Sequence, residues 1–300
     1  MIMAYRNIFI ANTAKLSAKN EQLIVDNGEK FSFPIEDIRS VLIEDYRSTL
    51  TTALISKFAE AGVTLLICNE KHIPTAALNP TNTYSRQLRQ INLQISSTLP
   101  LRKRLWQQVV SAKIMNQARC LEINGISDYQ QLEIMAKSVR SGDPSNIEGR
   151  AAAFYFRNLF GSDFRRTDDT PLNAALDYGY AIVRAVICRT ICLYGFEPSL
   201  GIHHCSELNN FNLADDLIEP FRPFVDLVVK KTLFDCNKFE TGDKAELLKS
   251  LNATMLVKNK NQSIVNAVEI IVQSYAECLN SGKADIVLPV LTELNYRNYE

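Results

Sequence analysis

The sequence predicts an α+β protein in which a small N-terminal β domain with one helix is followed by a larger all-α domain. Three observations predict this organisation. Short apolar runs separated by turn residues fill the first 80 residues, a Pro- and Asn-rich segment follows at 78–84, and the apolar period becomes helical from residue 86 onward. We therefore expect domains at 1–80 and 85–300.

Five runs rich in Val, Ile, Leu and Phe are expected to be strands, at 6–10, 22–26, 30–33, 40–43 and 63–68. Asn27-Gly28 predicts a tight hairpin in which both turn residues have positive φ. One helix interrupts the strands, with Ser48 as its expected cap and Gly62 after its last residue. This domain holds no cluster of catalytic residue types, so its expected role is structural, most plausibly dimerisation.

The remaining chain is expected to be helical throughout. Asp143-Pro144 is expected to begin one helix, with Asp143 as its cap, and Asn212 to cap another. Pro220 and Pro223 predict a kink or restart in the second of these. On the long helix the apolar positions are expected to be core and the basic ones to face out. The expected helices span 86–96, 101–124, 127–142, 144–160, 171–194, 212–219, 225–231, 243–256 and 262–279.

Composition is typical of a globular protein, with 300 residues, 46% hydrophobic and 22% charged. The most apolar stretch, 174–194, is interrupted by charged residues, so a buried helix is expected and no membrane segment. The N-terminus has no signal-peptide layout. Seven cysteines without a C-x-x-C pair argue against a disulfide framework and a cysteine zinc site. A reduced, cytoplasmic protein is expected.

The net charge is zero, but the charges are unevenly distributed. No acidic residue occurs between Glu70 and Glu122. A segment of one sign creates a local positive field that attracts phosphate, so these side chains are candidates for nucleic-acid binding. The alternative is a solvated helix face that acids elsewhere in the fold neutralise. The basic residues of the interval are Lys71, Arg86, Arg89, Arg102, Lys103, Arg104, Lys113 and Arg119.

Two histidines, His203 and His204, lie shortly before a cluster of acids that contains Asp216 and Glu219. The two acids are three residues apart, so on a helix they would share a face and could reach one cation together. Glu148, near another helix start, would supply a third carboxylate. Carboxylates with an imidazole suit Mn²⁺ and tolerate Mg²⁺, and open sites of this kind commonly activate phosphoryl transfer.

The alternative interpretation of these residues is a surface loop followed by a solvated helix start, with Glu148 favoured by the helix dipole alone. Together with the acid-free basic segment, however, the constellation predicts a metal-dependent enzyme that acts on DNA or RNA.

Four segments of the chain, together with its β-then-helical layout, resemble the CRISPR-associated integrases of the Cas-one family, and specifically their type II branch. Such a set of long, ordered matches is far more specific than one short motif. The segments are Leu105-Trp-Gln-Gln-Val-Val-Ser-Ala-Lys-Ile-Met-Asn-Gln, Ile147-Glu-Gly-Arg-Ala-Ala-Ala, Gly201-Ile-His-His and Phe211-Asn-Leu-Ala-Asp-Asp-Leu-Ile-Glu-Pro-Phe-Arg-Pro-Phe-Val-Asp226.

The resemblance implies that domain 85–300 is catalytic, with Glu148, His204 and Glu219 as catalytic residues that hold Mg²⁺ or Mn²⁺. Asp216 and His203 would be accessory. Many relatives have Asp where this chain has Glu219.

The implied activity is the insertion of protospacer DNA into a CRISPR array, by attack of a 3′-hydroxyl on a phosphodiester of the repeat, with associated endonuclease activity. The implied partners are a second copy of the chain and a protein of the Cas-two family, with other type II CRISPR proteins as further candidates. The rival classes are a non-catalytic DNA-binding scaffold and a metal-dependent nuclease that uses water as the nucleophile.

Overall fold

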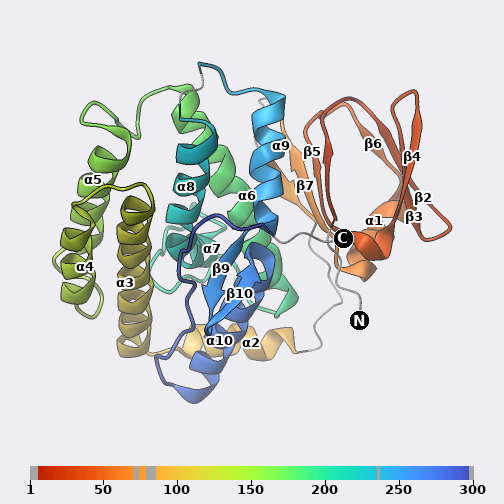
Figure 1. The fold of residues 1–300 in the computed structure, drawn as a ribbon. Helices are drawn as coiled ribbons and strands as arrows, with labels where there is room; N and C mark the ends of the chain where they lie inside the picture. Colours follow the sequence, from red (N-terminus) through yellow and green to blue (C-terminus); the bar gives the residue numbers. More distant parts are fainter. Residues whose placement is uncertain (1–5, 71–73, 79–85, 235–236, 297–300) are drawn as a thin grey trace.

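The computed structural model describes residues 6–70, 74–78, 86–234 and 237–296 (Figure 1). It confirms the predicted class, because a β-rich N-terminal part is followed by a larger helical part. The expected boundary at 78–84 lies almost entirely outside the described residues, so the division into two domains stays a prediction.

Two four-stranded sheets build the N-terminal part (Figure 1). In the first sheet three strands are parallel and the last is antiparallel. Its order is β1 (Arg6–Ile10), β5 (Ile38–Ile43), β7 (Thr64–Cys68) and β8 (Pro74–Ala77). The second sheet has the order β4 (Lys30–Pro34), β3 (Gln22–Asp26), β2 (Lys15–Lys19) and β6 (Thr49–Leu50). The sequence did not predict β2, β6 and β8, which are short or poor in β-branched residues.

The hairpin at Asn27-Gly28 is present, but its turn differs from the expected one. Asp26 pairs with Lys30, so the loop has three residues, and only Gly28 has a positive φ, at 107°. The two-residue turn with positive φ at both positions connects β2 and β3 instead, at Asn20-Glu21. Non-glycine residues take this conformation at a cost, so the paired strands on either side must stabilise it.

Helix α1 (Thr52–Ala61) begins later than expected, because Thr51 caps it by accepting a hydrogen bond from the amide of Leu54 at 3.3 Å. Ser48 is not the cap: its hydroxyl accepts from the amide of Ala14. Gly62 ends the helix with φ 72°, as predicted.

The strands of the first sheet contribute to two hydrophobic cores, one on each face. Val41 and Leu65 face the core of the N-terminal part, whereas Leu42, Leu66 and Cys68 belong to the core of the helical part. This follows from the period of two along a strand. The first sheet therefore packs against the core of the N-terminal part with one face and against the core of the helical part with the other.

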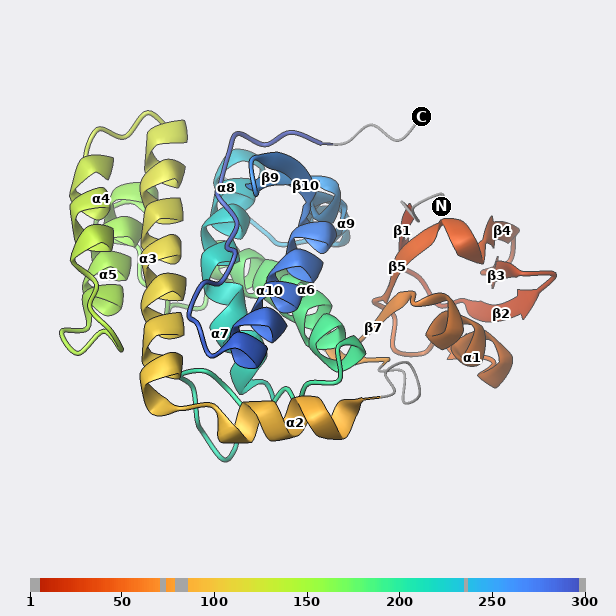
Figure 2. The same ribbon diagram turned by 90° about the horizontal axis from the view of Figure 1, so that it is seen from below.

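The helical part is arranged around α6, which packs against α7, α8, α9 and α10 and also contacts β7 and β8 (Figure 2). The long helix α3 packs on α4, α5, α7 and α8. The bounds are α2 (Gln87–Ser96), α3 (Leu99–Ile123), α4 (Tyr129–Ser138), α5 (Ile147–Phe160), α6 (Pro171–Leu193), α7 (Asn212–Ile218), α8 (Arg222–Thr232), α9 (Thr241–Lys249) and α10 (Ile264–Ser281).

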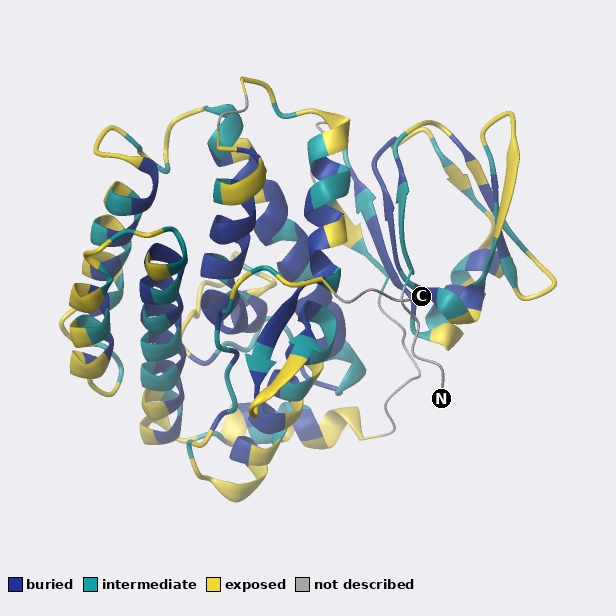
Figure 3. Cartoon of the chain, in the orientation of Figure 1, coloured by how far each residue is buried: buried dark blue, intermediate teal, exposed yellow. Residues whose placement is uncertain are grey.

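Burial follows this arrangement. The central helix α6 is largely buried, and the outer sides of α4 and α5 are exposed (Figure 3). No helix in the described residues combines the length and apolar character that a membrane span requires.

One expected helix, 243–256, is wrong over its second half. Helix α9 ends at Lys249, and a hairpin follows, formed by β9 (Thr254–Val257) and β10 (Lys260–Ser263). Lys258 and Asn259 both have positive φ and make its two-residue turn. The second part of the chain is thus helical with one added hairpin rather than all-α. The helix expected over 127–142 is also shorter, because α4 ends at Ser138.

Gly179 allows α6 and α8 to approach closely. A Cβ at this position would lie 2.5 Å from Cγ1 of Val225, a β-branched side chain with little rotamer freedom. Gly179→Ala is therefore expected to lower the free energy of unfolding by about 1–3 kcal/mol, measured by urea denaturation. Gly242→Ala in α9 is the control: no atom lies within 4 Å of its Cβ. Equal stability of the two variants would contradict this packing.

Candidate active site

Glu148 is the second residue of α5, and the preceding turn fixes the start of that helix. The helix begins at Ile147, three residues later than expected. Asn146 is its cap, and Asp143 accepts from the amides of Ile147 and Glu148, each at 2.9 Å. Asp143 and Asn146 both have positive φ, which Asn and Asp tolerate best among non-glycine residues. Asp143 thus caps the helix from further upstream than predicted.

Lys113 lies between two site carboxylates. Its ammonium is 2.6 Å from Oε1 of Glu148 and 2.5 Å from Oε2 of Glu219, and the residue is only 8% exposed. Burial acts to lower the pKa of Lys113, but the charges of Glu219 and Glu148 outweigh it and the pKa is raised.

The expectation that every basic residue of α3 faces out is therefore wrong for Lys113. This helix packs against several others, so its buried arc is wide enough to include a lysine. The ammonium of Lys113 is paired with two site carboxylates instead of facing solvent, and its role as a DNA contact stays a prediction.

Glu219 lies in a 3₁₀ turn, η2 (Glu219–Phe221), that joins α7 to α8. The restart predicted at Pro220 and Pro223 is present, because α7 ends before this turn and α8 begins after it. The side chain of Glu219 is almost fully buried, and Oε1 accepts from Nε of Arg222 at 2.8 Å. Burial alone would raise the pKa of Glu219, but Lys113 and Arg222 lower it to about 2. The carboxylate therefore stays charged.

The turn that carries Glu219 is tied to α3 by Asn116, which the sequence did not single out. Asn116 donates to the carbonyl of Pro220 at 2.7 Å and to that of Pro289 at 3.0 Å, and it accepts from the amide of Leu291. Asn116 is buried and follows Lys113 by three residues on the same helix. This amide network fixes the distance between α3 and the turn.

Asp216, which was expected to reach one cation together with Glu219, is engaged by the loop that carries the histidines. It is completely buried, and its two oxygens accept hydrogen bonds from the amides of Ile202, His203 and His204 at 2.5, 3.0 and 3.2 Å. Oδ1 also lies 2.7 Å from Nδ1 of His204. Asp216 therefore anchors residues 201–211, which carry both histidines and are called the histidine loop below.

Only glycine fits where this loop approaches Asp216. A Cβ on Gly201 would lie 2.2 Å from the carbonyl oxygen of His204 and 2.8 Å from Oδ2 of Asp216. Asn212 supports the loop as well. It is not the cap of α7: its side-chain amide is buried and donates to the carbonyls of Ser199 and Ser206.

The two imidazoles have different surroundings. His203 stacks on Trp106, with ring centroids 4.2 Å apart and planes 3° apart. His204 meets the edge of the same indole at 5.7 Å and bonds Asp216 through Nδ1. A carboxylate on Nδ1 holds the proton there in the neutral imidazole, which leaves the lone pair of Nε2 free. Trp106 is buried and lies seven residues before Lys113, on the same face of α3.

The chemistry of these donors suits Mg²⁺ or Mn²⁺, which prefer carboxylate oxygens and accept an imidazole. Glu148 and Glu219 both face one cation position, and the charge of Glu219 acts on the nearby His204. Within the described residues, however, no three acidic, histidine or cysteine side chains are gathered as a metal site. The ammonium of Lys113 takes the position between the two carboxylates instead.

Of the other predicted basic residues, Arg86 directly precedes α2, Arg89 lies on α2, and Arg102, Lys103, Arg104 and Arg119 lie on α3. Arg86, Lys103 and Arg104 are exposed, and Arg102 and Arg119 are half-buried. Arg89 is exposed and donates to Asn280 of α10 at 3.0 Å. Lys71 is outside the described residues. Figure 2 shows α2 running across one end of α3. Lys103 and Arg104 lie near this first end of α3, and Trp106 follows them along the helix.

The pKa of His204 is raised above its ordinary value of about 6.5, chiefly by the hydrogen bond to Asp216, with smaller contributions from neighbouring acids. The stabilisation from this pair is fully present below pH about 6.5 and is lost as the pH rises through the folded-state value.

Asp216→Asn is expected to lower the pKa of His204, measured by NMR titration of its ring protons. Asp215→Asn is the matched control, since Asp215 acts on His204 through charge alone. Its effect is expected to be smaller. Equal shifts in the two variants would mean that the hydrogen bond is not the main cause.

The chain is similar to one family of proteins over most of its length. The family model described as "CRISPR associated protein Cas1" matches residues 8–269. A Neisseria meningitidis serogroup C protein named "CRISPR-associated endonuclease Cas1" is 40% identical over 306 residues, which cover 99% of this chain and 100% of that protein. A Francisella tularensis subsp. novicida protein named "CRISPR-associated endonuclease Cas1 1" is 25% identical over 272 residues, 81% of this chain and 84% of that protein.

Solved structures share the fold. A casposase bound to an integration product has a TM-score of 0.76 at 19% identity and covers 94% of this chain and 92% of that one. A CAS1 protein from Thermotoga maritima has a TM-score of 0.70 at 15% identity, over 94% and 99% of the two chains. The match to the family model, together with 40% identity along the whole of one relative, establishes that this chain belongs to the CRISPR associated protein Cas1 family.

Proposed function

We propose that the protein is a metal-dependent DNA integrase of CRISPR adaptation with associated endonuclease activity. The observation that carries the proposal is the meeting of Glu148 and Glu219, from separate elements of the chain, at the single cation Lys113. Two findings support the assignment to DNA: the full-length relative is named an endonuclease, and a protein of the same fold is bound to an integration product.

The proposed reaction is an in-line displacement at phosphorus. The 3′-hydroxyl of the protospacer attacks a phosphodiester of the CRISPR repeat, one phosphodiester bond forms as another breaks, and a 3′-hydroxyl leaves. No ATP is needed, and the sequence contains no G-x-x-x-x-G-K-[ST] motif. Mg²⁺ or Mn²⁺, held by Glu148, His204 and Glu219, would neutralise charge on the phosphoryl group and ease deprotonation of the nucleophile.

The protein side chains orient these groups. Arg222 fixes one oxygen of Glu219, so the other is directed toward Glu148. Asp216 holds Nδ1 of His204, which leaves Nε2 to act as a ligand or as the proton donor to the leaving oxygen. The stack on Trp106 keeps His203 away from that role.

We propose that the DNA backbone runs along the basic surface of α2 and α3, formed by Arg86, Arg89, Arg102, Lys103, Arg104 and Arg119. Lys103 and Arg104 are exposed near the start of α3 and attract phosphate, and Trp106 lies further along the same helix. Such a substrate places the protein in the cytoplasm, where the array lies.

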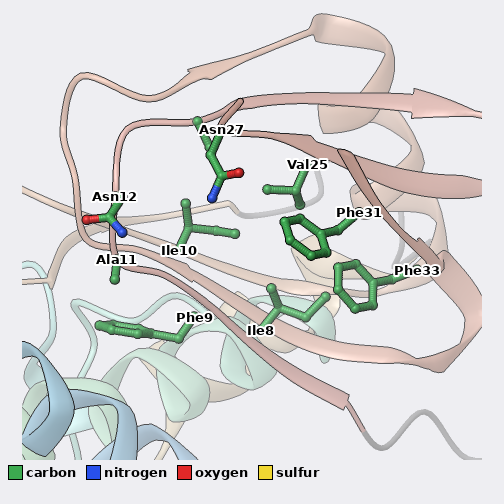
Figure 4. Close-up of a pocket in the computed structure, with 10 residues that line it drawn as sticks. Ile8, Phe9, Ile10, Ala11, Asn12, Val25, Asn27, Phe31 and Phe33 are labelled. Carbon is green, nitrogen blue, oxygen red and sulfur yellow. The ribbon is translucent and has the colours of Figure 1, made fainter. Parts of the chain in front are cut away.

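We further propose that the N-terminal part forms a homodimer and that the dimer binds a protein of the Cas-two family, with other type II CRISPR proteins as additional partners. A groove of about 230 Å³ supports the homodimer. Phe31 and Phe33 of β4 face Ile8 of β1 across this groove, and Phe31 is 44% exposed (Figure 4). Binding to a protein of the Cas-two family is supported by two structures of the same fold, which are Cas6-RT-Cas1–Cas2 complexes.

Substitution of the two carboxylates tests the proposed function. Glu148→Gln and Glu219→Gln keep the size of each side chain but remove its charge, and each is expected to slow strand transfer by at least about 100-fold. The measurement is the yield of joined product from a DNA with a 3′-hydroxyl, in Mn²⁺. Glu207→Gln, an exposed glutamate of the histidine loop, is the control and should keep wild-type activity.

The same assay separates the rival functions. A substrate that lacks the 3′-hydroxyl should give no joined product. Cleavage without joining in the wild type would indicate a nuclease that uses water, and full activity in either carboxylate variant would exclude the proposed site. Circular dichroism and DNA binding of the variants establish that they are folded.

The histidine variants should differ in the assay. His204→Ala is expected to reduce strand transfer at least about tenfold more than His203→Ala, because only His204 is oriented by a carboxylate toward the site. The reverse order would show that His203 is the functional imidazole.

A further inference from the structure

The ammonium of Lys113 lies between the two carboxylates that are proposed to hold the divalent ion. It contacts one oxygen of Glu148 at 2.6 Å and one of Glu219 at 2.5 Å. Mg²⁺ binds oxygen at about 2.0–2.1 Å, so shifts of well under 1 Å would let the same two oxygens bind the ion. An ion and an ammonium cannot both lie between them, because they would overlap and repel each other.

The charge of this cluster is already balanced. Glu148 and Glu219 contribute two negative charges, and Lys113 and Arg222 contribute two positive ones. A divalent ion added to the cluster as it stands would enter a neutral site and meet two nearby cations. Release of Lys113 restores a negative charge to the position, which is the condition for strong binding of a hard cation.

The arrangement is built into the core. The side chain of Lys113 is 10% exposed, and its neighbours Val109, Val110 and Ile114 on α3 are fully buried. Glu219 has a second cation in Arg222, so it does not depend on Lys113 alone for neutralisation. The lysine is therefore placed to hold the pair of carboxylates together rather than to satisfy one of them.

We infer that Lys113 is an internal counter-ion of the metal site: it holds Glu148 and Glu219 together in the metal-free protein, and a divalent ion binds only as the ammonium withdraws. The inference rests on the proposed function, since it assumes that these two carboxylates are the ligands. It adds that the metal competes with a residue of the protein itself for the site.

Mn²⁺ affinity of the full-length protein, measured without DNA by electron paramagnetic resonance of the free ion, tests the inference. Lys113→Met removes the competing charge and keeps an apolar stem, so the dissociation constant for Mn²⁺ should fall at least about tenfold. The metal-free variant should melt at a lower temperature than the wild type, and Mn²⁺ should raise its melting temperature more.

Lys244→Met is the matched control. Lys244 is equally buried and lies 2.5 Å from Glu44, an acid outside the site, so its loss should leave Mn²⁺ affinity unchanged. If Lys113→Met does not fold, Lys113→Gln serves instead, because it keeps a hydrogen-bond donor without the charge and should also tighten binding.

Two outcomes would overturn the proposals separately. Unchanged or weaker Mn²⁺ binding by a folded Lys113 variant, with Glu148→Gln still abolishing binding, would overturn the counter-ion role alone. Equal Mn²⁺ binding by the wild type and Glu148→Gln would instead remove the carboxylates as ligands, and with them the proposed catalytic site.

Discussion

The burial of Glu219 as a charged group is the constraint on which the site depends. Removing a carboxylate from water costs several kcal/mol, and good geometry with paired cations is needed to offset that cost. Lys113 comes from α3 and Arg222 from α8, so both helices must be in place before Glu219 can be buried. The same requirement fixes the separation of α3 and α8, because neither cation can move far without leaving a buried charge unpaired.

The network extends from there to α6. The guanidinium of Arg222 lies 4.7 Å from the ring centre of Tyr180, and Tyr180 donates to the buried Asp226, as does Tyr155 at 2.9 Å. Burial raises the pKa of Asp226 to about 6 against the lowering effect of the two tyrosines. Asp226 thus supports the position of Arg222 without facing the site.

A second buried acid controls the histidine loop. The segment between Gly201 and α7 has no regular hydrogen bonding of its own, and Asp216 supplies acceptors for three of its amides. The loop is exposed to solvent, but its backbone conformation is fixed by hydrogen bonds to the buried Asp216. The orientation of His204 therefore depends on α7 as much as on its own neighbours in the chain.

Sequence patterns predicted most helices because their signals are local. The end of α1 at Gly62 and the break at Pro220 depend on one or two residues each. The strand β2 and the hairpin that begins at Thr254 were missed, since their two-residue turns use non-glycine residues at positive φ and so lack the glycine that signals a tight turn in the sequence.

The site was predictable in its residue types but not in its contacts. The structure places Glu148 and Glu219 against one lysine, and their role as metal ligands stays a prediction. That Asp216 binds the histidine loop and that Lys113 is turned inward could not be foreseen. Spacing along a helix shows which residues share a face, but which face is buried depends on packing partners that lie far away in the sequence. Trp106 and Asn116 were missed for the same reason.

The burial of β5 and β7 against a different core on each face has a consequence for folding. A slip of one residue in the pairing of these strands would exchange the sets of side chains that face the two cores, so Leu42 and Leu66 would leave one core while Val41 and Leu65 left the other. The wrong register would therefore disrupt the packing of both cores at the same time. The register of β5 and β7 is thus specified from both faces of the sheet at once.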